Sequence, residues 1–481
     1  MNKFKYLIIL MIPLLVGLAG CEKLEDFGDT NNNPGSTTTP IVGALLTNVE
    51  SQIGGYAANT RGGLYSQYFS ETQYTDVSLY SLPQLNLNGE YAGVLFDLQN
   101  ILIQNVSNNQ NVVAKILQQY IYWTLTDRWG DIPYSEALTG NPTPKYDKQE
   151  DVYKGMINTL KSAVTEFDNT SIITGDIILN GDVARWKKFA NSLRMLMALR
   201  LAKRYPGPSD YAATEFKAAL NDPAGYIATN SDNFTILYPG GNYKNPWYNT
   251  YNGRKDFAES APMVALLNSF SDNRQTVFGG KTDDQNKANP DWDDPSTVGM
   301  PYGLERSKSE AFTAANPTWA RILRGDKREE TDPQVIVGAA HVTLARAQAA
   351  DMGWTNEDLT ALYTTGIQQS FEQWGLTMPA TYPTNAGVAL TAAQGTGGNK
   401  MQIALQRYIA AYPDGLQGWS IWRETGYPVL TPAPDATNAS KQIPRRYTYG
   451  QSEYGTNADQ TNAAAASMGG DTPETKVWWD L

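Results

Sequence analysis

The stretch that decides the fold is residues 112–137, VVAKILQQYIYWTLTDRWGDIPYSEA. Its apolar residues at 112, 113, 116, 117, 121 and 125 follow the period of about 3.6 residues that marks an α-helix. Gly130 is a plausible stop after Trp129, and Pro133 cannot continue a helix. The stretch therefore predicts a long helix over 112–129 that ends in a turn.

Further helices are predicted after this one. They span residues 150–167, 183–204, 341–352, 356–374 and 399–411. Asp182 is a plausible N-cap for the helix over 183–204. Alanine and glycine at the expected crossings resemble tetratricopeptide units, although no clean 34-residue repeat is visible. We expect a mostly α protein, a tetratricopeptide-like superhelix of helix pairs.

Composition excludes several classes of protein. The chain has 481 residues, 41 % of them hydrophobic, with a mean hydropathy of −0.43, which fits a sizeable core but not a multi-span membrane protein. Its formal charge is −11, and a nucleic-acid binder normally has a basic surplus. It contains one cysteine and one histidine, too few for a structural zinc site or most nucleophilic catalysis. His341 is expected to be a cap or a packed polar residue.

The N-terminus reads MNKFKYLIILMIPLLVGLAGC over residues 1–21. Lys3 and Lys5 precede an apolar run, 6–19, that is too short to span a bilayer but suits a secretory signal. Small residues lead directly to Cys21, the sole cysteine, which predicts a lipoprotein signal peptide over 1–20 and lipidation of Cys21; the alternative is an ordinary signal peptide with a chance cysteine. Residues 21–40 are polar and rich in Gly and Pro, and we expect a flexible tether.

Two regions of the remaining chain lack helical periodicity. Residues 230–335 and 412–481 are rich in Gly, Pro and aromatic residues, and long irregular insertions on a scaffold commonly carry function. We therefore expect one domain over 41–481, with a helical scaffold, a loop-rich half and a variable ligand-facing insertion at about 230–335.

Several segments, in order, resemble the SusD/RagB family of nutrient-binding outer-membrane lipoproteins of Bacteroidota. They are CEKLEDFGDTNNNPG (21–35), TDRWGDIPYSEA (126–137), WKKFANSLR (186–194), GLQGWSIWRETGYP (415–428), IPRRY (443–447), SEY (452–454), GGD (469–471) and WWD (478–480). The resemblance spans nearly the whole chain after residue 20, but its segments belong to the scaffold and do not identify a ligand.

The resemblance implies a tetratricopeptide-like scaffold that supports a variable half. It also implies a lipid-anchored protein on the outer face of the outer membrane, paired with a SusC-type TonB-dependent transporter. In such pairs the lipoprotein acts as a lid that captures oligosaccharide or peptide and delivers it to the barrel.

The main candidate ligand site is the segment 238–257, YPGGNYKNPWYNTYNGRKDF. Sugar rings have apolar faces and hydroxyl edges, so their sites need an aromatic platform with a few polar groups. Trp247, Tyr248 or Tyr251 would stack on a sugar, while Asn252, Arg254 and Asp256 would bind hydroxyls or amides. Alternatively, the rings pack the loop onto the scaffold and Arg254 pairs with Asp256.

Other aromatic residues are further candidates. Trp292 lies among aspartates in NPDWDDP (289–295), which favours exposure, and Tyr302 follows it. Tyr74 and Tyr80 in QYFSETQYTDVSLY (67–80) are reserve contacts in a segment expected to be mainly scaffold. We expect no metal or cofactor, although the aspartates around Trp292 leave calcium as a lesser alternative without EF-hand spacing.

These features predict a binding protein and not an enzyme. A glycosidase needs only two suitably spaced carboxylates, so the 49 acidic residues leave that alternative open. However, the motifs of hydrolases, phosphate loops and dinucleotide folds are absent, and most of the case against catalysis comes from the resemblance.

An oligosaccharide is favoured over a peptide because Trp and Tyr concentrate in the irregular middle, and the acidic charge suits a neutral glycan. N-acetylated glycans such as chitin fragments are a guess among these. Two alternatives are a peptide-binding member of the family and a structural lid without its own ligand site.

Overall fold

The helical scaffold occupies most of the chain in a computed structural model that describes residues 40–481. The predicted signal peptide, the lipidation site Cys21 and nearly all of the predicted tether lie outside the described residues. Residues Val42–Leu481 form one unit. Its longer helices are α2 (Val42–Ala57), α5 (Phe96–Gln104), α6 (Asn108–Trp129), α7 (Gln149–Glu166), α8 (Val183–Arg200), α9 (Tyr211–Leu220), α14 (Ala339–Asp351), α15 (Leu359–Gln373), α16 (Lys400–Ala411) and α17 (Gly415–Thr425).

The helices predicted from periodicity are confirmed, with ends that differ by a few residues. The central helix α6 begins at Asn108, because Ser107 caps it by accepting a hydrogen bond from the backbone N–H of Gln110 at 3.4 Å. Helix α8 begins after the predicted cap Asp182, whose side chain accepts from the N–H of Arg185 at 3.1 Å. It ends at Arg200, four residues earlier than the sequence suggested.

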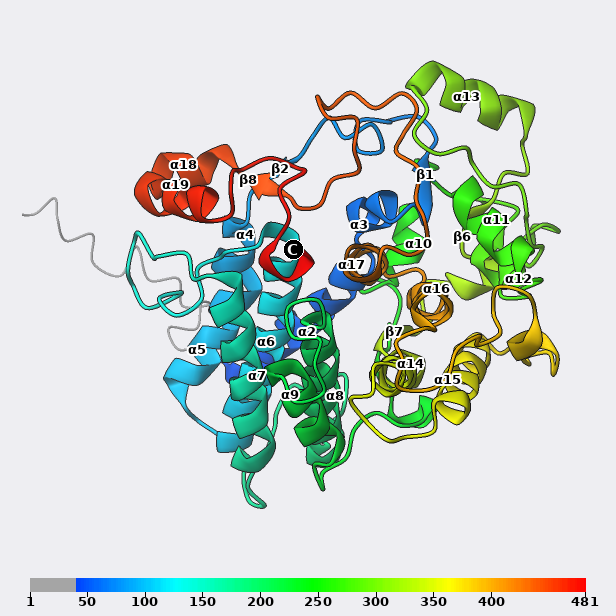
Figure 1. The fold of residues 1–481 in the computed structure, drawn as a ribbon. Coiled ribbons are helices and arrows are strands. Elements are labelled where there is room, and N and C mark those ends of the chain that lie inside the picture. The colour runs from blue at the N-terminus through cyan, green and yellow to red at the C-terminus, as the bar shows by residue number, and fades with distance from the viewer. Residues whose placement is uncertain (1–39) are drawn as a thin grey trace, which may run out of the picture. The chain divides into compact units, whose positions relative to one another are not determined.

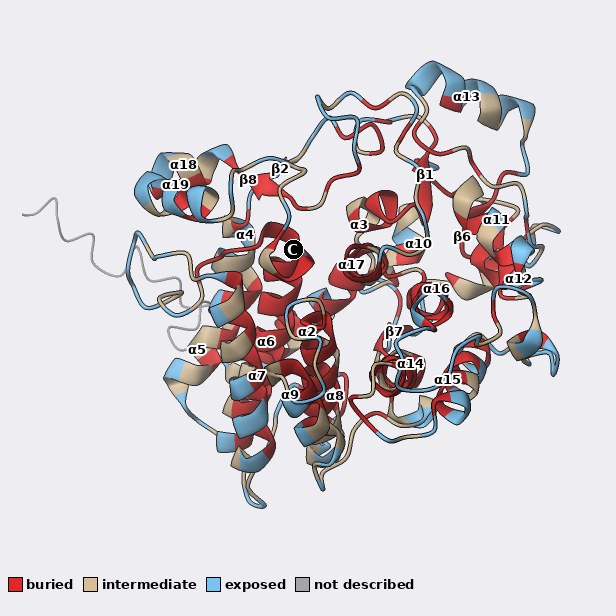
Figure 2. Ribbon diagram, viewed as in Figure 1, coloured by how far each residue is buried: buried red, intermediate tan, exposed pale blue. Residues whose placement is uncertain are grey.

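The helices form two groups of neighbours (Figure 1). Helices α6, α7, α8 and α9 pack in sequence order, and α14, α15, α16 and α17 make a second group. Helix α6 is almost wholly buried, Asp127 and Arg128 included (Figure 2). The mostly α, tetratricopeptide-like fold class is thus confirmed.

The loop-rich half consists of short elements. Its helices are α3 (Thr60–Tyr65), α4 (Asn88–Glu90), α10 (Pro246–Thr250), α11 (Ala261–Ser269), α12 (Gln275–Phe278), α13 (Arg306–Ala315), α18 (Gln451–Thr456) and α19 (Ala458–Ser467). The strands of the described residues form two-stranded pairs that join distant segments: β1 (Phe69–Glu71) with β4 (Phe257–Glu259), β2 (Gln84–Leu85) with β8 (Thr448–Tyr449), β3 (Phe234–Ile236) with β7 (Gln334–Val337), and β5 (Gly279–Gly280) with β6 (Arg321–Ile322).

The expectation that 412–481 is irregular throughout was wrong. Asp414 caps α17 by accepting from the N–H groups of Leu416 and Gln417 at 3.0 and 3.1 Å, so a helix starts near the beginning of this stretch. Helices α18 and α19 follow later in the same stretch. Glycines and polar residues concealed the helical period there.

Three of the segments that suggested the family meet in the core around a buried ion-pair cluster, which comprises Asp127, Arg200, Arg407 and Glu424. Arg200 Nη1 lies 3.1 Å from Glu424 Oε2, and Arg407 Nη1 lies 2.6 Å from Glu424 Oε1. Trp479, near the end of the chain, donates its indole N–H to Asp127 Oδ1 at 2.9 Å. The segments around 127, 424 and 479 thus share one set of buried contacts, because buried charges need partners.

Candidate functional site

A polar hollow of about 630 Å³ lies where the loop after β1 meets the segment between α10 and β4. A volume of this size is typical of small-molecule sites. We call it the Tyr74 hollow. Its lining residues are Gln73, Tyr74, the run 251–256 and the run 283–285.

Antiparallel pairing of β1 with β4 brings these distant segments together. Phe69 lies opposite Glu259 and Glu71 opposite Phe257, so the residues after β1 are placed beside those before β4. The contact continues past the strands, since the N–H of Thr72 donates to the carbonyl of Asp256 at 2.9 Å. The amide of Gln73 also donates to the carboxylate of Asp256.

Tyr74 supplies the exposed aromatic surface of the hollow. Its side chain is 52 % exposed. The guanidinium carbons of Arg254 and of Arg306, on α13, lie 6.0 and 5.3 Å from the ring centroid, within cation–π range. The ring is thus held in place by charged neighbours while much of its surface is open to solvent.

A buried carboxylate, Glu71, stabilises the loop that carries Tyr74 through hydrogen bonds. Glu71 accepts hydrogen bonds from the backbone N–H and the hydroxyl of Ser78, at 2.8 and 2.7 Å, and so closes the loop 71–78. Burial raises the pKa of Glu71 to about 7, although the two hydrogen bonds from Ser78 act in the opposite direction.

Most charges in the hollow are paired. Arg254 Nη2 lies 2.5 Å from Asp256 Oδ2, and Arg321 Nη2 lies 2.5 Å from Asp283 Oδ1. Gln285 donates its amide to the carbonyl of Tyr248 at 2.7 Å, while its own amide oxygen accepts no bond. The hollow therefore offers an aromatic face, amides and neutralised ion pairs, which can bind hydroxyl and amide groups of a ligand.

Five of the sequence candidates line this hollow: Tyr74, Tyr251, Asn252, Arg254 and Asp256. The local Arg254–Asp256 pair expected under the packing alternative is also present. Tyr248 lies just outside the lining, partly exposed, with the Lys244 ammonium 4.8 Å from its ring centroid.

The structure corrects the exposure expected of the other aromatic candidates. Trp247, Tyr251, Trp292, Tyr302 and Tyr80 are 1, 2, 6, 8 and 1 % exposed. Because their rings pack inside the protein, they do not present stacking faces to a ligand.

Each of these rings is buried for an identifiable reason. The Trp247 ring contacts Phe69 edge to face at a centroid distance of 5.5 Å. The Tyr251 hydroxyl donates to the carbonyl of Phe257 at 2.8 Å and accepts from the N–H of Ile322 at 2.7 Å. Tyr302 and Tyr80 meet through their hydroxyls at 3.4 Å.

Trp292 is covered although aspartates flank it, because two of these carboxylates pair with a lysine and the third, Asp293, is exposed to solvent. Arg328 lies 5.6 Å from the Trp292 ring centroid. The Lys281 ammonium lies 2.5 Å from Asp291 Oδ1 and 3.0 Å from Asp294 Oδ2. Among residues 40–481 no group of three or more metal-ligating side chains is gathered, and calcium stays an untested alternative.

Sequence reasoning missed Asp283, Asp284, Gln285 and Arg306 as parts of this site. They lie inside the irregular region 230–335, but no local pattern distinguishes them from other polar loop residues. Only the fold shows that they approach Tyr74.

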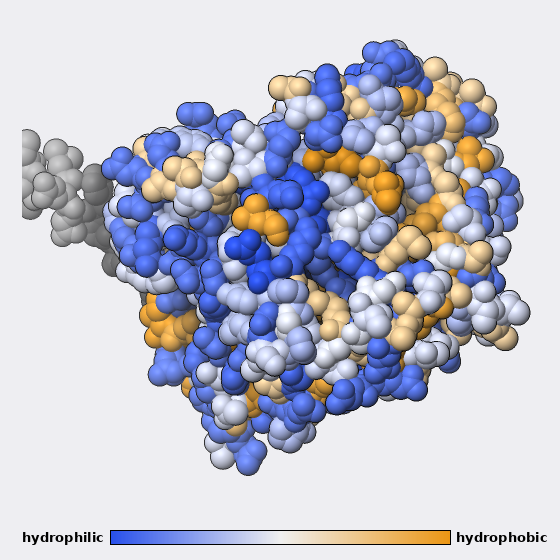
Figure 3. Space-filling view, in the orientation of Figure 1, coloured by the Kyte–Doolittle hydropathy of each residue, from blue (hydrophilic) through white to orange (hydrophobic). Residues whose placement is uncertain are grey.

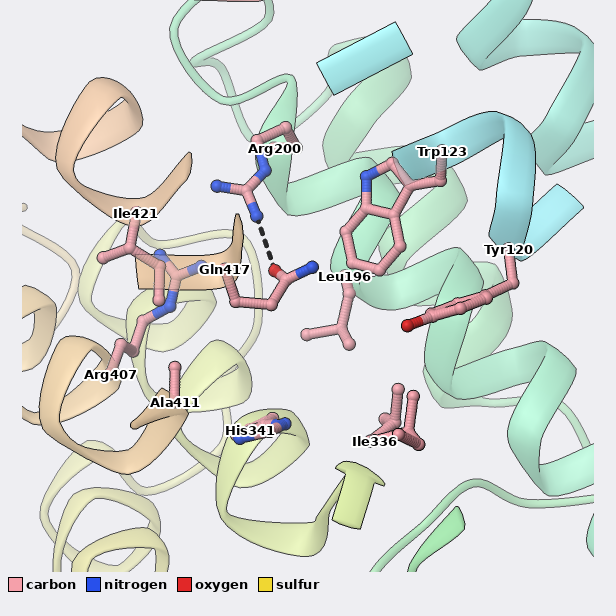
Figure 4. Close-up of a pocket in the computed structure, with 11 residues that line it drawn as sticks. Tyr120, Trp123, Leu196, Arg200, Ile336, His341, Arg407, Ala411, Gln417 and Ile421 are labelled. Carbon is pink, nitrogen blue, oxygen red and sulfur yellow. Dashed lines mark hydrogen bonds between the residues drawn. The ribbon is translucent and has the colours of Figure 1, made fainter. Parts of the chain in front are cut away.

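A second candidate, an internal cavity beside the buried ion-pair cluster, is too small for a nutrient (Figure 4). It has a volume of about 30 Å³, roughly the space of one water molecule, and Arg200 donates across it to the amide oxygen of Gln417 at 3.0 Å. His341 lies at its edge, where burial lowers its pKa to about 4. Its ring bonds to the backbone of Gly338 and Ala410, so the prediction of a packed polar residue is confirmed.

The described part of the chain has no helix with the length and apolar content to cross a membrane. The face seen in Figure 3 is mainly hydrophilic, with apolar groups in separate patches. A helical scaffold that holds an exposed aromatic ring beside a polar hollow has the features of a ligand-binding site.

Comparison with known proteins gives the family. A family model described as "Starch-binding associating with outer membrane" matches residues 30–450, and the chain therefore belongs to the SusD-like family. A search of curated proteins found no match.

Solved structures show the same fold. A SusD homologue from Bacteroides uniformis is 26 % identical, with a TM-score of 0.78, and the match covers 92 % of this chain and 99 % of that one. A structure described as a chitin-binding protein is also 26 % identical, with a TM-score of 0.76 and 92 and 100 % coverage. A chitin-binding SusD homologue from Flavobacterium johnsoniae is 23 % identical, with a TM-score of 0.77 and 92 and 98 % coverage.

Proposed function

We propose that the protein captures a neutral oligosaccharide in the Tyr74 hollow without cleaving it. The observation that carries the proposal is the half-exposed ring of Tyr74 beside amides and paired charges. An exposed ring can stack on the apolar face of a sugar, and the polar groups around it can bind the hydroxyls.

The charges support a neutral ligand over a polyanion. Arg254 and Arg321 are engaged by carboxylates, and the remaining charged lining residues, Lys255 and Asp284, have opposite signs. The family description and the chitin-binding neighbours also support a glycan, with N-acetylated chains as one candidate among neutral ones.

In the cell, the proposed role is nutrient uptake at the outer membrane. Cys21 would carry a lipid anchor on the exterior face, and a SusC-type TonB-dependent transporter would receive the captured glycan. The family description associates its members with the outer membrane, which supports the location. Copurification with a TonB-dependent barrel and mass spectrometry of the Cys21 peptide would test these two steps.

The first prediction concerns Tyr74. We expect the full chain in detergent to bind at least one of starch, xylan, mannan, inulin or chitin oligomers in calorimetry. Tyr74→Ala should weaken that binding about tenfold, because the stacking surface is lost, whereas Tyr74→Phe should retain most of it.

The matched control is Phe96→Ala, which removes an exposed ring on α5 outside the hollow. Binding to a peptide digest alone would assign the protein to peptide capture. No binding to any member of the panel, with the barrel still copurifying, would favour a structural lid. Release of shortened sugars would show an enzyme.

A further inference from the structure

A second hollow of similar size lies between α2 and the segment 236–249. Its volume is about 670 Å³, and we call it the Tyr243 hollow. Residues of α2 between Thr47 and Gly55 form one side, and Ile177 and side chains of the run 236–249, two prolines among them, form the rest.

The linings of the two hollows adjoin in the sequence, at α10 and the turn that follows it. Pro246 and Asn249 line the Tyr243 hollow, while Asn252 lines the Tyr74 hollow. The N–H of Asn252 donates to the carbonyl of Asn249 at 3.2 Å, so these two rim residues are directly bonded. Tyr248 connects the hollows too: its carbonyl accepts from Gln285 in one, and its ring lies 4.8 Å from the Lys244 ammonium of the other.

The chemistry of the Tyr243 hollow suits an uncharged ring with polar edges. Tyr243 is 61 % exposed and offers a stacking surface. The amide side chains of Asn242 and Asn249 are exposed on its rim. Lys244 is the one charged lining residue, and its ammonium is neutralised by Glu330 at 2.9 Å.

We propose that the Tyr243 hollow is a second subsite for the same glycan chain, which runs from the Tyr74 hollow across α10. This inference rests on the proposed function and adds a chain-length preference to it: an oligosaccharide that reaches both rings binds more tightly than one that fills a single hollow. Occupying two joined sites with one ligand increases affinity because the second contact forms within the same complex.

The Tyr243 hollow also has apolar walls, from Ile236, Leu237 and the two prolines, which an apolar peptide segment could contact. The backbone turn that links Asn249, in this lining, to Asn252, in the lining of the Tyr74 hollow, favours the glycan. The peptide is therefore an outcome that the experiment must distinguish.

The test is a ladder of chito-oligosaccharides and malto-oligosaccharides, from disaccharide to octasaccharide, titrated into the full chain in detergent. The unmodified protein should bind the longest member of the preferred ladder about tenfold more tightly than the shortest. Tyr243→Ala should remove that gain and leave disaccharide binding unchanged. Tyr243→Phe should keep the gain, since its ring remains.

Tyr74→Ala separates the two proposals. It should weaken binding at every length, whereas Tyr243→Ala should affect only the long chains. The second subsite is overturned if Tyr243→Ala still binds long oligosaccharides more tightly than short ones. It is also overturned if the unmodified protein shows no such preference. In both cases glycan capture in the Tyr74 hollow stands. If the protein binds neither oligosaccharide ladder nor any glycan of the wider panel, both proposals are overturned. A peptide that binds only when Tyr243 is intact overturns the glycan assignment of the Tyr243 hollow. Unchanged thermal unfolding of Tyr243→Ala, expected for an exposed side chain, shows that the variant is folded.

Discussion

Tyr74 and Trp247 are both aromatic residues near the same strand pair, but they have opposite exposure. The Trp247 ring packs against Phe69 of β1, whereas Tyr74 extends beyond the end of that strand among arginines. Substitution should therefore act on stability at Trp247 and on binding at Tyr74.

The second prediction concerns the stability of the protein when Trp247 is replaced. Trp247→Ala should lower the free energy of unfolding by about 3–5 kcal/mol, the usual cost of truncating a fully buried Trp. Urea unfolding followed by circular dichroism measures this change. Trp247→Phe should cost clearly less, because much of the contact with Phe69 is kept.

Tyr74→Ala provides the comparison, with a change in unfolding free energy within about 0.5 kcal/mol. If Trp247→Ala were as stable as the unmodified chain and lost glycan binding, Trp247 would have to face the ligand as the sequence first suggested.

At the scale of elements, the crossing of α3 and α17 depends on glycines that touch. A Cβ at Gly415 would lie 2.0 Å from the backbone nitrogen of Gly63, closer than atoms can approach. The sequence indicated small residues at the helix crossings, and this contact is the physical reason for them here.

The third prediction is that Gly415→Ala lowers the free energy of unfolding by about 1–3 kcal/mol, because α3 and α17 must move apart. Gly455→Ala, in α18, is the matched control: no atom lies within 4 Å of its added Cβ. There alanine should stabilise the chain by roughly 0.5–1 kcal/mol, since glycine is the poorer helix former. Thermal unfolding should thus move in opposite directions for the two variants, and parallel shifts would contradict the assigned contact.

The helices and the site differ in how far sequence could predict them. Helix positions follow from a local period, so α6, α8 and α16 were placed to within a few residues. Ring exposure depends on contacts with distant segments: nothing local to Trp292 shows that Lys281 neutralises its aspartates. The segment 252–256 was identified by its residue types, but its meeting with Tyr74 requires the β1–β4 pairing.

At the scale of the whole molecule, buried ionisable groups make stability depend on pH. Burial raises the pKa of Glu259 to about 8, against a hydrogen bond from Gln275 that favours ionisation. Between its ordinary value and about 8 the folded chain keeps this proton while the unfolded chain has lost it. Stability due to Glu259 therefore falls as the pH rises through this window.

His341 has the opposite effect in part of the window. Its pKa is lowered to about 4, so below its ordinary value of 6.5 the unfolded chain binds the extra proton and stability rises with pH. Above pH 6.5 this contribution is complete, whereas the loss of stability through the buried acids Glu71 and Glu259 continues.

The fourth prediction is that the melting temperature falls between pH 6.5 and 8, and that Glu259→Gln flattens the decline. Glu372→Gln, at an exposed carboxyl on α15, is the control and should leave the slope unchanged. A slope that is the same in Glu259→Gln and the unmodified protein would show that this acid is ionised in the folded state.

The bond from Trp479 to Asp127 joins residues 352 positions apart, and the β2–β8 pair joins Gln84 to Thr448. Loops of that length must close before their contacts contribute stability, which makes folding slow for topologies dominated by distant contacts. Until the last segment arrives, Asp127 lacks its indole donor and the centre of the scaffold is incomplete. The native core is consequently complete only once segments from both ends of the described chain have met, so it forms late in folding.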